Sequence, residues 1–364
     1  MGRMTTRKGS EGGLFRDACF TSGSPPQEGL PTLHLLGVGK VGKAFLRCLP
    51  QRSYRLLCVT DSKASLYERG GLDPLWVLRE KAEGKSLKGI AGSWEIETET
   101  AVSRVEADCV VDCTATDLDD PGRALRRTLS ILESGRAVVL GAKDSLLADT
   151  GALLEPRFRG RLGIHALLGG TGWNLMEELD ELRASCAEIV AVPNATTTLL
   201  VQSIEEGLDF EEATRRAGEE GLLEHDPAQD LEGKDAALKL SIVARAVFGS
   251  EVDFDAISRP SAGELDPGML RGRRERGFTT RLVCRAKPGG TLHLGYEEIP
   301  LDSNLAIPWR NVAYGYRLRR GELRLHLGNG VGPAATAQAL LEDLDRLFGR
   351  GNAHGPPPPP KRGS

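Results

Sequence analysis

Residues 224–245 bring carboxylates and lysines to the entrance and one face of an expected helix. The stretch reads EHDPAQDLEGKDAALKLSIVAR, so acids, a proline and a glycine precede an amphipathic pattern that predicts a helix over 231–247. Asp235 and Lys239 are four residues apart and therefore share a helix face. Such groups could bind a charged small molecule. The alternative is an exposed Asp–Lys pair on a surface helix.

A second stretch, LHLLGVGKVG, has glycines in G-x-G-x-x-G spacing after an apolar run and before a helical pattern. In a βαβ unit this loop binds a dinucleotide, with the pyrophosphate at the helix N-terminus. We expect the loop residues to contact the cofactor, namely Gly37, Val38, Gly39, Lys40, Val41 and Gly42. The alternative is a similar turn in an unrelated α/β fold.

The next apolar run ends at Asp61, where an acid commonly binds the ribose hydroxyls of NAD. Ser62 and Lys63 follow at once and would equally suit a 2′-phosphate. The sequence therefore predicts NAD(P) as the cofactor and leaves the choice between NAD and NADP open.

The elements that must position these residues alternate between short apolar runs and helical stretches. TLHLLG, YRLLCVTD, ADCVVDCTAT and AVVLGAK are each followed by a helical pattern, which predicts a parallel sheet covered on both faces. We therefore expect an α/β fold: a Rossmann-like, doubly wound nucleotide-binding domain over 31–163, completed by 307–350, with an inserted α+β domain over 164–306.

After Gly163 the pattern changes to longer helical stretches interleaved with strands such as AEIVAV, FTTRLVCRA and NVAYGYRL. Asp209 and Glu212 have the spacing of a capping box at one helix start. A last helix, expected over 336–348, follows the glycine cluster GNGVG, and it must return to the first domain if Gly330 is to touch the dinucleotide. Residues 1–30 and the proline-rich 351–364 are expected to be disordered.

Composition narrows the class of protein. The chain has 364 residues, a net charge of −4 and a pI near 6.0, which argues against a nucleic-acid surface. No apolar run is long enough for a membrane span and the start lacks a secretion signal, so we expect a cytoplasmic protein without membrane contact. The seven cysteines have no C-x-x-C pair, which indicates reduced thiols. No His or Cys set has metal-ligand spacing, so no metal is expected.

The central stretch resembles the signature of the homoserine dehydrogenase family. It matches the pattern G-x-x-E-x-D-P-x-x-D-x-x-G-x-D-A-x-x-K-L, from Gly221 to Leu240. VVLGAK is similar to the family's V-V-T-A-N-K element and puts Lys143 on its lysine. PNATTTLLVQSIEEG and GNGVGPAATAQALLEDL resemble further family segments in the same order, so the resemblance covers about residues 33–348.

The resemblance implies NAD(P)-dependent interconversion of L-homoserine and L-aspartate 4-semialdehyde by hydride transfer, a step toward threonine and methionine. It implies Lys143 and Lys239 as catalytic residues, with Lys143 also near the cofactor, and three acids that bind the substrate: Glu224, Asp230 and Asp235. Thr114, at a strand end, would face the nicotinamide, or would simply cap the strand. The family resemblance also implies a homodimer formed through the inserted domain.

One stretch departs from the family pattern. IHALLGGTGWNL, over 164–175, places His165 where the family has a glutamate that helps hold a monovalent cation. Because imidazole is a poor ligand for a hard cation, we expect no sodium there and treat His165 as a half-buried strand residue. Leu222, Ala195 and Thr198 also differ from the family. Two alternatives therefore stay open: a dehydrogenase of a related amino-acid semialdehyde, and a non-catalytic dinucleotide-binding sensor.

Overall fold

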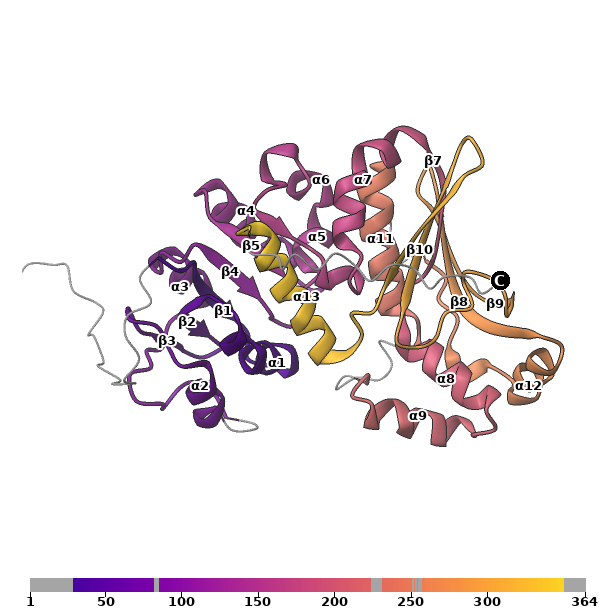
Figure 1. The fold of residues 1–364 in the computed structure, drawn as a ribbon, viewed down its shortest axis with the longest axis horizontal. Coiled ribbons are helices and arrows are strands. Elements are labelled where there is room, and N and C mark those ends of the chain that lie inside the picture. Colours follow the sequence, from indigo (N-terminus) through magenta and orange to yellow (C-terminus); the bar gives the residue numbers. More distant parts are fainter. Residues whose placement is uncertain are drawn as a thin grey trace, which may run out of the picture.

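Two β-sheets, each with its own helices, organise the chain (Figure 1). The computed structural model describes residues 29–81, 85–223, 231–250, 252, 254 and 257–349. Of the ends expected to be disordered, residues 1–28 and 351–364 lie outside the described residues, and residues 29 and 30 are described. Within the described ranges, no helix is both long and apolar enough to cross a membrane.

The first sheet has six strands in the order β3-β2-β1-β4-β5-β6. Their bounds are β1 Thr32–Leu36, β2 Arg55–Thr60, β3 Ser65–Tyr67, β4 Cys109–Asp112, β5 Ala137–Leu140 and β6 Leu162–Gly163. All neighbours pair in parallel except β3, which runs antiparallel to β2. Leu35 packs into the core on one face and Leu36 into the core on the other. Burial on both faces explains the continuous apolar runs and confirms the predicted doubly wound sheet.

Helices cover both faces of this sheet. They are α1 Lys40–Cys48, α2 Pro74–Glu80, α3 Thr98–Arg104, α4 Pro121–Glu133, α5 Asp144–Ala148, α6 Thr150–Leu153 and α13 Gly332–Leu347. The last of these, coloured yellow in Figure 1, packs along α1, β5 and β6. The chain end therefore returns to the first domain, as expected from its glycine cluster.

The second sheet has five strands in the order β11-β10-β7-β8-β9, and all neighbours pair antiparallel. Their bounds are β7 Cys186–Val192, β8 Phe278–Lys287, β9 Thr291–Pro300, β10 Val312–Leu318 and β11 Leu323–Gly328. Its helices are α7 Gly172–Ser185, α8 Ala195–Glu205, α9 Phe210–Glu219, α11 Lys234–Phe248 and α12 Pro267–Glu275. The capping box at α9 is confirmed, with both of its hydrogen bonds present.

The expected domain boundary near residue 307 needs correction. Strands β10 and β11 belong to the antiparallel sheet, so only α13 from 307–350 completes the first domain. Tyr314 and Tyr316 of β10 are buried in the same core cluster as residues of α7 and α11. That core continues from the second sheet to one face of the first, since Leu146 of α5 and Ile189 of β7 belong to the same cluster.

Candidate active site

Lys143, Asp235 and Lys239 meet between the two domains. Lys143 follows β5 and occupies the N-cap position of α5, whereas Asp235 and Lys239 lie in the first two turns of α11. The Nζ of Lys143 is 3.3 Å from Oδ1 of Asp235, and the Nζ of Lys239 is 2.7 Å from Oδ2. The structure thus brings two separate sequence motifs onto one carboxylate.

Asn194 and Pro193 complete this cluster, and sequence reasoning did not assign a role to either. Asn194 Nδ2 donates a hydrogen bond to Asp235 Oδ2 at 3.1 Å, while its Oδ1 accepts from Thr197 N and caps α8. Lys239 Nζ also donates to the Pro193 carbonyl at 3.1 Å. An asparagine directly before a helical run is a recognisable N-cap signal, which could have located Asn194 but not its contact with Asp235.

The electrostatics of the cluster favour an ionised carboxylate. Burial alone would raise the pKa of Asp235, but Lys239, Lys143 and the hydrogen bond from Asn194 lower that pKa overall. The carboxylate therefore keeps its charge at physiological pH. Two lysines facing one carboxylate leave an excess of positive charge, which suits an oxygen that becomes negative during a reaction.

A cavity of about 210 Å³ joins this cluster to the glycine loop. Lys143, Asp235 and Lys239 line one part of it, and Lys40 and Val41 line another. The expected catalytic residues and the cofactor loop therefore open into one space, as a transfer between a cofactor and a substrate requires.

The glycine loop has the geometry that a pyrophosphate needs. Gly37 has φ +83°, and a Cβ there would lie 2.5 Å from the Cys113 carbonyl oxygen. A Cβ at Gly42 would lie 2.1 Å from the Gly37 oxygen, whereas one at Gly39 would meet nothing within 4 Å. Gly39 is the N-cap of α1 and has no side-chain cap, so the first backbone amides of the helix stay open to an anion.

Gly330 lies on another wall of the cavity. Its N–H donates to the Gly169 carbonyl at 2.9 Å, and a Cβ there would lie 2.8 Å from the Gly169 carbonyl carbon. The glycine is therefore required for close packing of the two backbones. Its expected contact with the cofactor stays a prediction.

Asp61 has a different environment from the one expected. Its Oδ1 accepts hydrogen bonds from Lys63 N and Ala64 N, and its Oδ2 accepts from Leu87 N and from Lys81 Nζ at 2.5 Å. With four donors on a buried carboxylate, Asp61 fixes the loops after β2 and α2. The predicted ribose contact would have to compete with these bonds, and it stays a prediction.

Thr114 makes the contacts of a strand-end cap, which was the alternative role considered for it. Its N–H and its hydroxyl both donate to Asp112 Oδ1, at 3.0 and 2.6 Å, which closes the turn after β4. Thr114 is absent from the residues that line the 210 Å³ cavity. These bonds fit the capping role, and the expected position of Thr114 beside the nicotinamide stays a prediction.

His165 is the N-cap residue of a short 3₁₀ turn over 166–168, not a strand residue as expected. Its N–H donates to the buried Asp343 carboxylate at 3.0 Å. Its ring accepts from Trp173 N at 3.4 Å on Nδ1 and lies 3.4 Å from Glu342 on Nε2. Among the described residues, no group of three or more His, Cys, Asp or Glu side chains is arranged to hold a metal ion.

Two expected substrate residues, Glu224 and Asp230, lie outside the described residues. The chain that leads to them does reach the site, because Gly221 and Leu222 line the cavity. Lys40 Nζ donates to the carbonyl of Leu223 at 3.0 Å, which ties the glycine loop to this segment.

Comparisons with known proteins fit this geometry. The family model described as Homoserine dehydrogenase matches residues 175–344, which include α11 and the antiparallel sheet. The model described as Glutamate/Leucine/Phenylalanine/Valine dehydrogenase matches residues 31–119, which include the glycine loop. A homoserine dehydrogenase from Methanocaldococcus jannaschii is 27% identical over 331 residues, covering 86% of this chain and 97% of that protein. Both the family model over 175–344 and this relative thus relate the chain to homoserine dehydrogenases.

Solved structures of the family share the fold. A homoserine dehydrogenase from Thermoplasma acidophilum has a TM-score of 0.69 at 19% identity, covering 88% of this chain and 99% of the other. A hyperthermophilic archaeal homoserine dehydrogenase in complex with NADPH has a TM-score of 0.68 at 20% identity, covering 88% and 98%. The family-model match, which spans the central signature, confirms the resemblance found in the sequence.

Proposed function

We infer that this protein is an NAD(P)-dependent homoserine dehydrogenase, which interconverts L-homoserine and L-aspartate 4-semialdehyde. The observation that carries this inference is the convergence of Lys143, from the first domain, and Lys239, from the second, on Asp235. The three residues face a cavity that they share with the glycine loop. The reaction belongs to amino-acid biosynthesis, and we place the enzyme in the cytoplasm.

The residues of the chain fit the chemistry of this reaction. A bound nicotinamide cofactor supplies or accepts the hydride at C4 of the substrate. Lys143 and Lys239 are the candidates to give a proton to the C4 oxygen during reduction and to take it back during oxidation. Asp235 contacts both lysines and orients them, and Asn194 holds Asp235. Glu224 and Asp230 are proposed to bind the ammonium and hydroxyl end of the substrate.

Both forms of the cofactor are compatible with the loop after β2. The carboxylate of Asp61 is directed to Lys81 and three backbone amides, which leaves little of its charge to repel a 2′-phosphate. Ser62 and Lys63 are exposed beside it and could approach a 2′-phosphate. We therefore propose that the enzyme accepts NADP as well as NAD.

The two alternative functions are less well supported. A non-catalytic sensor has no need of a buried carboxylate between two lysines, yet the chain keeps this arrangement. A dehydrogenase of another amino-acid semialdehyde rests on the departures in 164–175, at Leu222 and at Ala195. The relatives found in the comparisons are named homoserine dehydrogenases and do not favour that reading.

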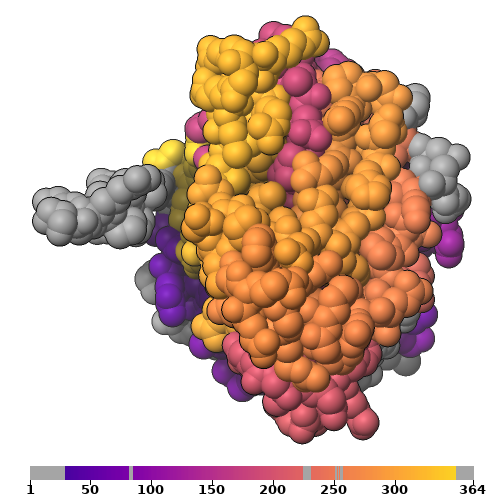
Figure 2. Space-filling model, turned by 90° about the vertical axis from the view of Figure 1, so that its right-hand side faces the viewer, coloured from indigo at the N-terminus to yellow at the C-terminus, as the bar shows by residue number. Residues whose placement is uncertain are grey.

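We also propose that the enzyme is a homodimer formed through the second sheet. Figure 2 looks onto the outer side of this part of the molecule, where the orange and yellow strands face the viewer. Register with β10 puts Leu323, Leu325 and Leu327 of β11 on the face opposite the buried tyrosines. Leu323 is 41% exposed and Leu327 is 55% exposed, so the outer face offers apolar surface to a second copy.

The proposed activity is tested with purified protein, L-aspartate 4-semialdehyde and either NADPH or NADH. Oxidation of the cofactor is followed by absorbance, and the product is identified as homoserine by mass spectrometry. Saturable cofactor oxidation with matching homoserine formation supports the proposal. If the protein turns over a different semialdehyde but not L-aspartate 4-semialdehyde, the proposed substrate is wrong. Binding of NADPH without turnover of any semialdehyde would favour a sensor.

A further inference from the structure

Two loops of the first domain are joined beside Lys143. One is the turn over 112–117 after β4, and the other is the segment 141–144 after β5. Three hydrogen bonds connect them, from Gly141 N to Asp112 O at 2.7 Å, from Lys143 N to Thr116 Oγ1 at 3.2 Å and from Asp117 N to Asp144 Oδ2 at 3.4 Å. The backbone of Lys143 is therefore held by the 112–117 turn.

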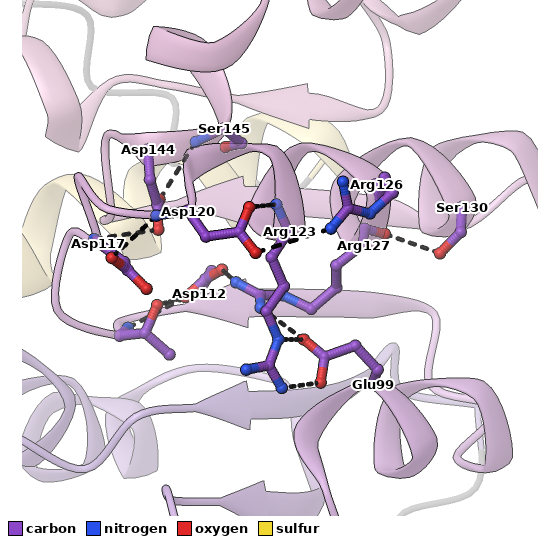
Figure 3. A network of polar contacts seen from close by, with 11 residues as sticks. Glu99, Asp112, Asp117, Asp120, Arg123, Arg126, Arg127, Ser130, Asp144 and Ser145 are labelled. Atoms are coloured by element: carbon purple, nitrogen blue, oxygen red, sulfur yellow. Dashed lines mark hydrogen bonds and ion pairs between the residues drawn. The ribbon is translucent and has the colours of Figure 1, made fainter.

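One arginine of α4 anchors the 112–117 turn. Arg127 Nη2 donates to Asp112 Oδ2 at 2.7 Å, and the other oxygen of Asp112 accepts both donors of Thr114. Figure 3 shows Arg127 reaching from α4 toward Asp112, with Asp117 and Asp144 on the other side of the turn. The helix α4 also packs against α5, whose N-cap is Lys143.

The charges make this anchor necessary. Asp112 is 2% exposed and Asp144 is 3% exposed, so two carboxylates are buried near each other. Burial, and next the charge of Asp112, raises the pKa of Asp144. The side chain of Arg127, 8% exposed, supplies a positive charge close to both. Without it the two carboxylates would lack this compensation, and the turn would relax.

We propose that Arg127 is a positioning residue for Lys143, acting through Asp112 and the 112–117 turn. Lys143 must keep its ammonium beside Asp235 across the domain boundary. Its Nζ is 3.3 Å from Oδ1 of Asp235. A small shift of the turn moves the backbone that carries Lys143 and so misplaces the proton donor relative to the substrate oxygen. The kinetic part of this inference rests on the proposed function.

Arg123 provides a matched control on the same helix. It binds Glu99 through two hydrogen bonds, at 2.8 and 2.6 Å, and its side chain is 53% exposed. Arg127 also approaches Glu99, at 3.4 Å, and it donates a hydrogen bond to Asp112 as well. The two side-chain hydrogen bonds of Arg123 go to Glu99. Loss of Arg123 therefore removes an arginine and an ion pair from α4 while leaving the contact to the turn.

The first experiment compares Arg127→Met with Arg123→Met. Arg127→Met should lower kcat for semialdehyde reduction about 10- to 100-fold, the scale of a misplacement near 1 Å. The Kd for NADPH, measured by fluorescence, should change much less than kcat, because the bonds of Arg127 go to Asp112 and Glu99 and not to the glycine loop. Arg123→Met should keep the wild-type kcat. Equal kcat values in the two variants would overturn the proposal.

A double-variant cycle separates positioning from a general loss of structure. In a Lys143→Ala background, Arg127→Met should reduce kcat little further, since both changes act on the same ammonium. A full additional loss would show that Arg127 acts elsewhere. If Arg127→Met does not fold, Asp112→Asn takes its place, because it keeps the shape of the side chain and removes the charge that Arg127 binds. A wild-type kcat in Asp112→Asn would overturn the proposal.

A readout that does not need turnover keeps the two conclusions distinct. Acylation of Lys143 by acetic anhydride, followed by mass spectrometry, reports the surroundings of its amine directly. The rate should change severalfold in Arg127→Met and remain unchanged in Arg123→Met. If the wild type lacks turnover but this difference is present, the proposed function fails and the positioning role stands. Identical acylation rates in both variants would contradict the positioning role.

Discussion

Lys143 and Asp235 lie 3.3 Å apart although 92 residues and a domain boundary separate them. Lys143 extends from the parallel sheet and Asp235 from α11, so their contact depends on how the two domains pack. The packing is fixed by a continuous hydrophobic core that includes Leu146 near Lys143 and Ala236 next to Asp235. The cluster of Lys143, Asp235 and Lys239 is thus assembled by the same core that joins the domains.

The two lysines should act as a unit. Lys143→Ala and Lys239→Ala should each lower kcat by about 10²- to 10⁴-fold, the usual effect of losing a general acid. The double variant should be little worse than either single variant, because each lysine depends on the shared Asp235. Steady-state kinetics give kcat, while the Tm and the Kd for NADPH serve as controls. Near-normal turnover in both single variants would make the lysines structural.

Asp61→Ala distinguishes the structural role of Asp61 from a ribose contact. Because the carboxylate is bonded to Lys81 and to backbone amides, the variant should lose about 3–5 kcal/mol of stability, as when one partner of a buried pair is removed. The ratio of kcat/KM for NADPH and NADH should stay unchanged. A clear rise in relative use of NADPH would show that Asp61 does reach the ribose. Lys63→Ala is the companion variant, and it should reduce the use of NADPH more than that of NADH.

The lowered pKa of Asp61 should make the stability of the protein depend on pH. Burial alone would raise the pKa of Asp61, but Lys81 and three amides lower it overall. Asp61 therefore stabilises the folded state above its unfolded pKa of about 3.9, and this contribution is lost as the pH falls through the lower folded pKa. The Tm difference between the wild type and Asp61→Asn should be constant near neutral pH and should shrink below about pH 4. A difference that grows on acidification would contradict the assignment.

Sequence patterns predicted the first domain better than the second for a physical reason. Strands such as Cys109–Asp112 and Ala137–Leu140 are buried on both faces, so their apolar runs are continuous and easily recognised. The strands Thr291–Pro300 and Leu323–Gly328 are the two edges of the antiparallel sheet and mix exposed with buried residues. We did not predict either edge strand.

Local spacing located some site residues but not their partners. Asp235 and Lys239 were expected on one helix face, and their 2.7 Å contact confirms that prediction. Asp61 was placed by its distance from the glycines, but its partner Lys81 is 20 residues further along the chain and carried no signal. The contact from Asn194 to Asp235 joins residues 41 positions apart, and it arises only when the N-cap of α8 meets the first turn of α11. Such contacts require the tertiary structure.

Activity should not depend on the kind of monovalent cation. His165 stands where the family has a glutamate, and its two ring nitrogens contact Trp173 N and Glu342. Sodium and potassium chloride should therefore give the same kcat/KM at fixed ionic strength, with choline chloride as the control salt. Saturable activation by one cation alone would contradict this prediction. The variant His165→Glu tests the cause, since an added carboxylate should introduce a preference if the other ligands are present.

If the protein is a dimer, its molar mass in solution should fall on dilution, and a change at Leu327 should weaken the dimer. Leu327 is 55% exposed on the outer face of the second sheet, where it would be buried against a second copy. Leu327→Glu would place a charge in that apolar contact and should shift the protein toward monomers in light scattering over a dilution series. Leu75 of α2, 43% exposed on the first domain, is the matched control, and Leu75→Glu should keep the wild-type mass. A wild type that is monomeric at every concentration would refute the dimer, whereas an unchanged dimer in Leu327→Glu would move the interface to another surface. Because Lys143, Asp235 and Lys239 all come from one chain, the monomeric variant should retain turnover, provided the second domain keeps its fold.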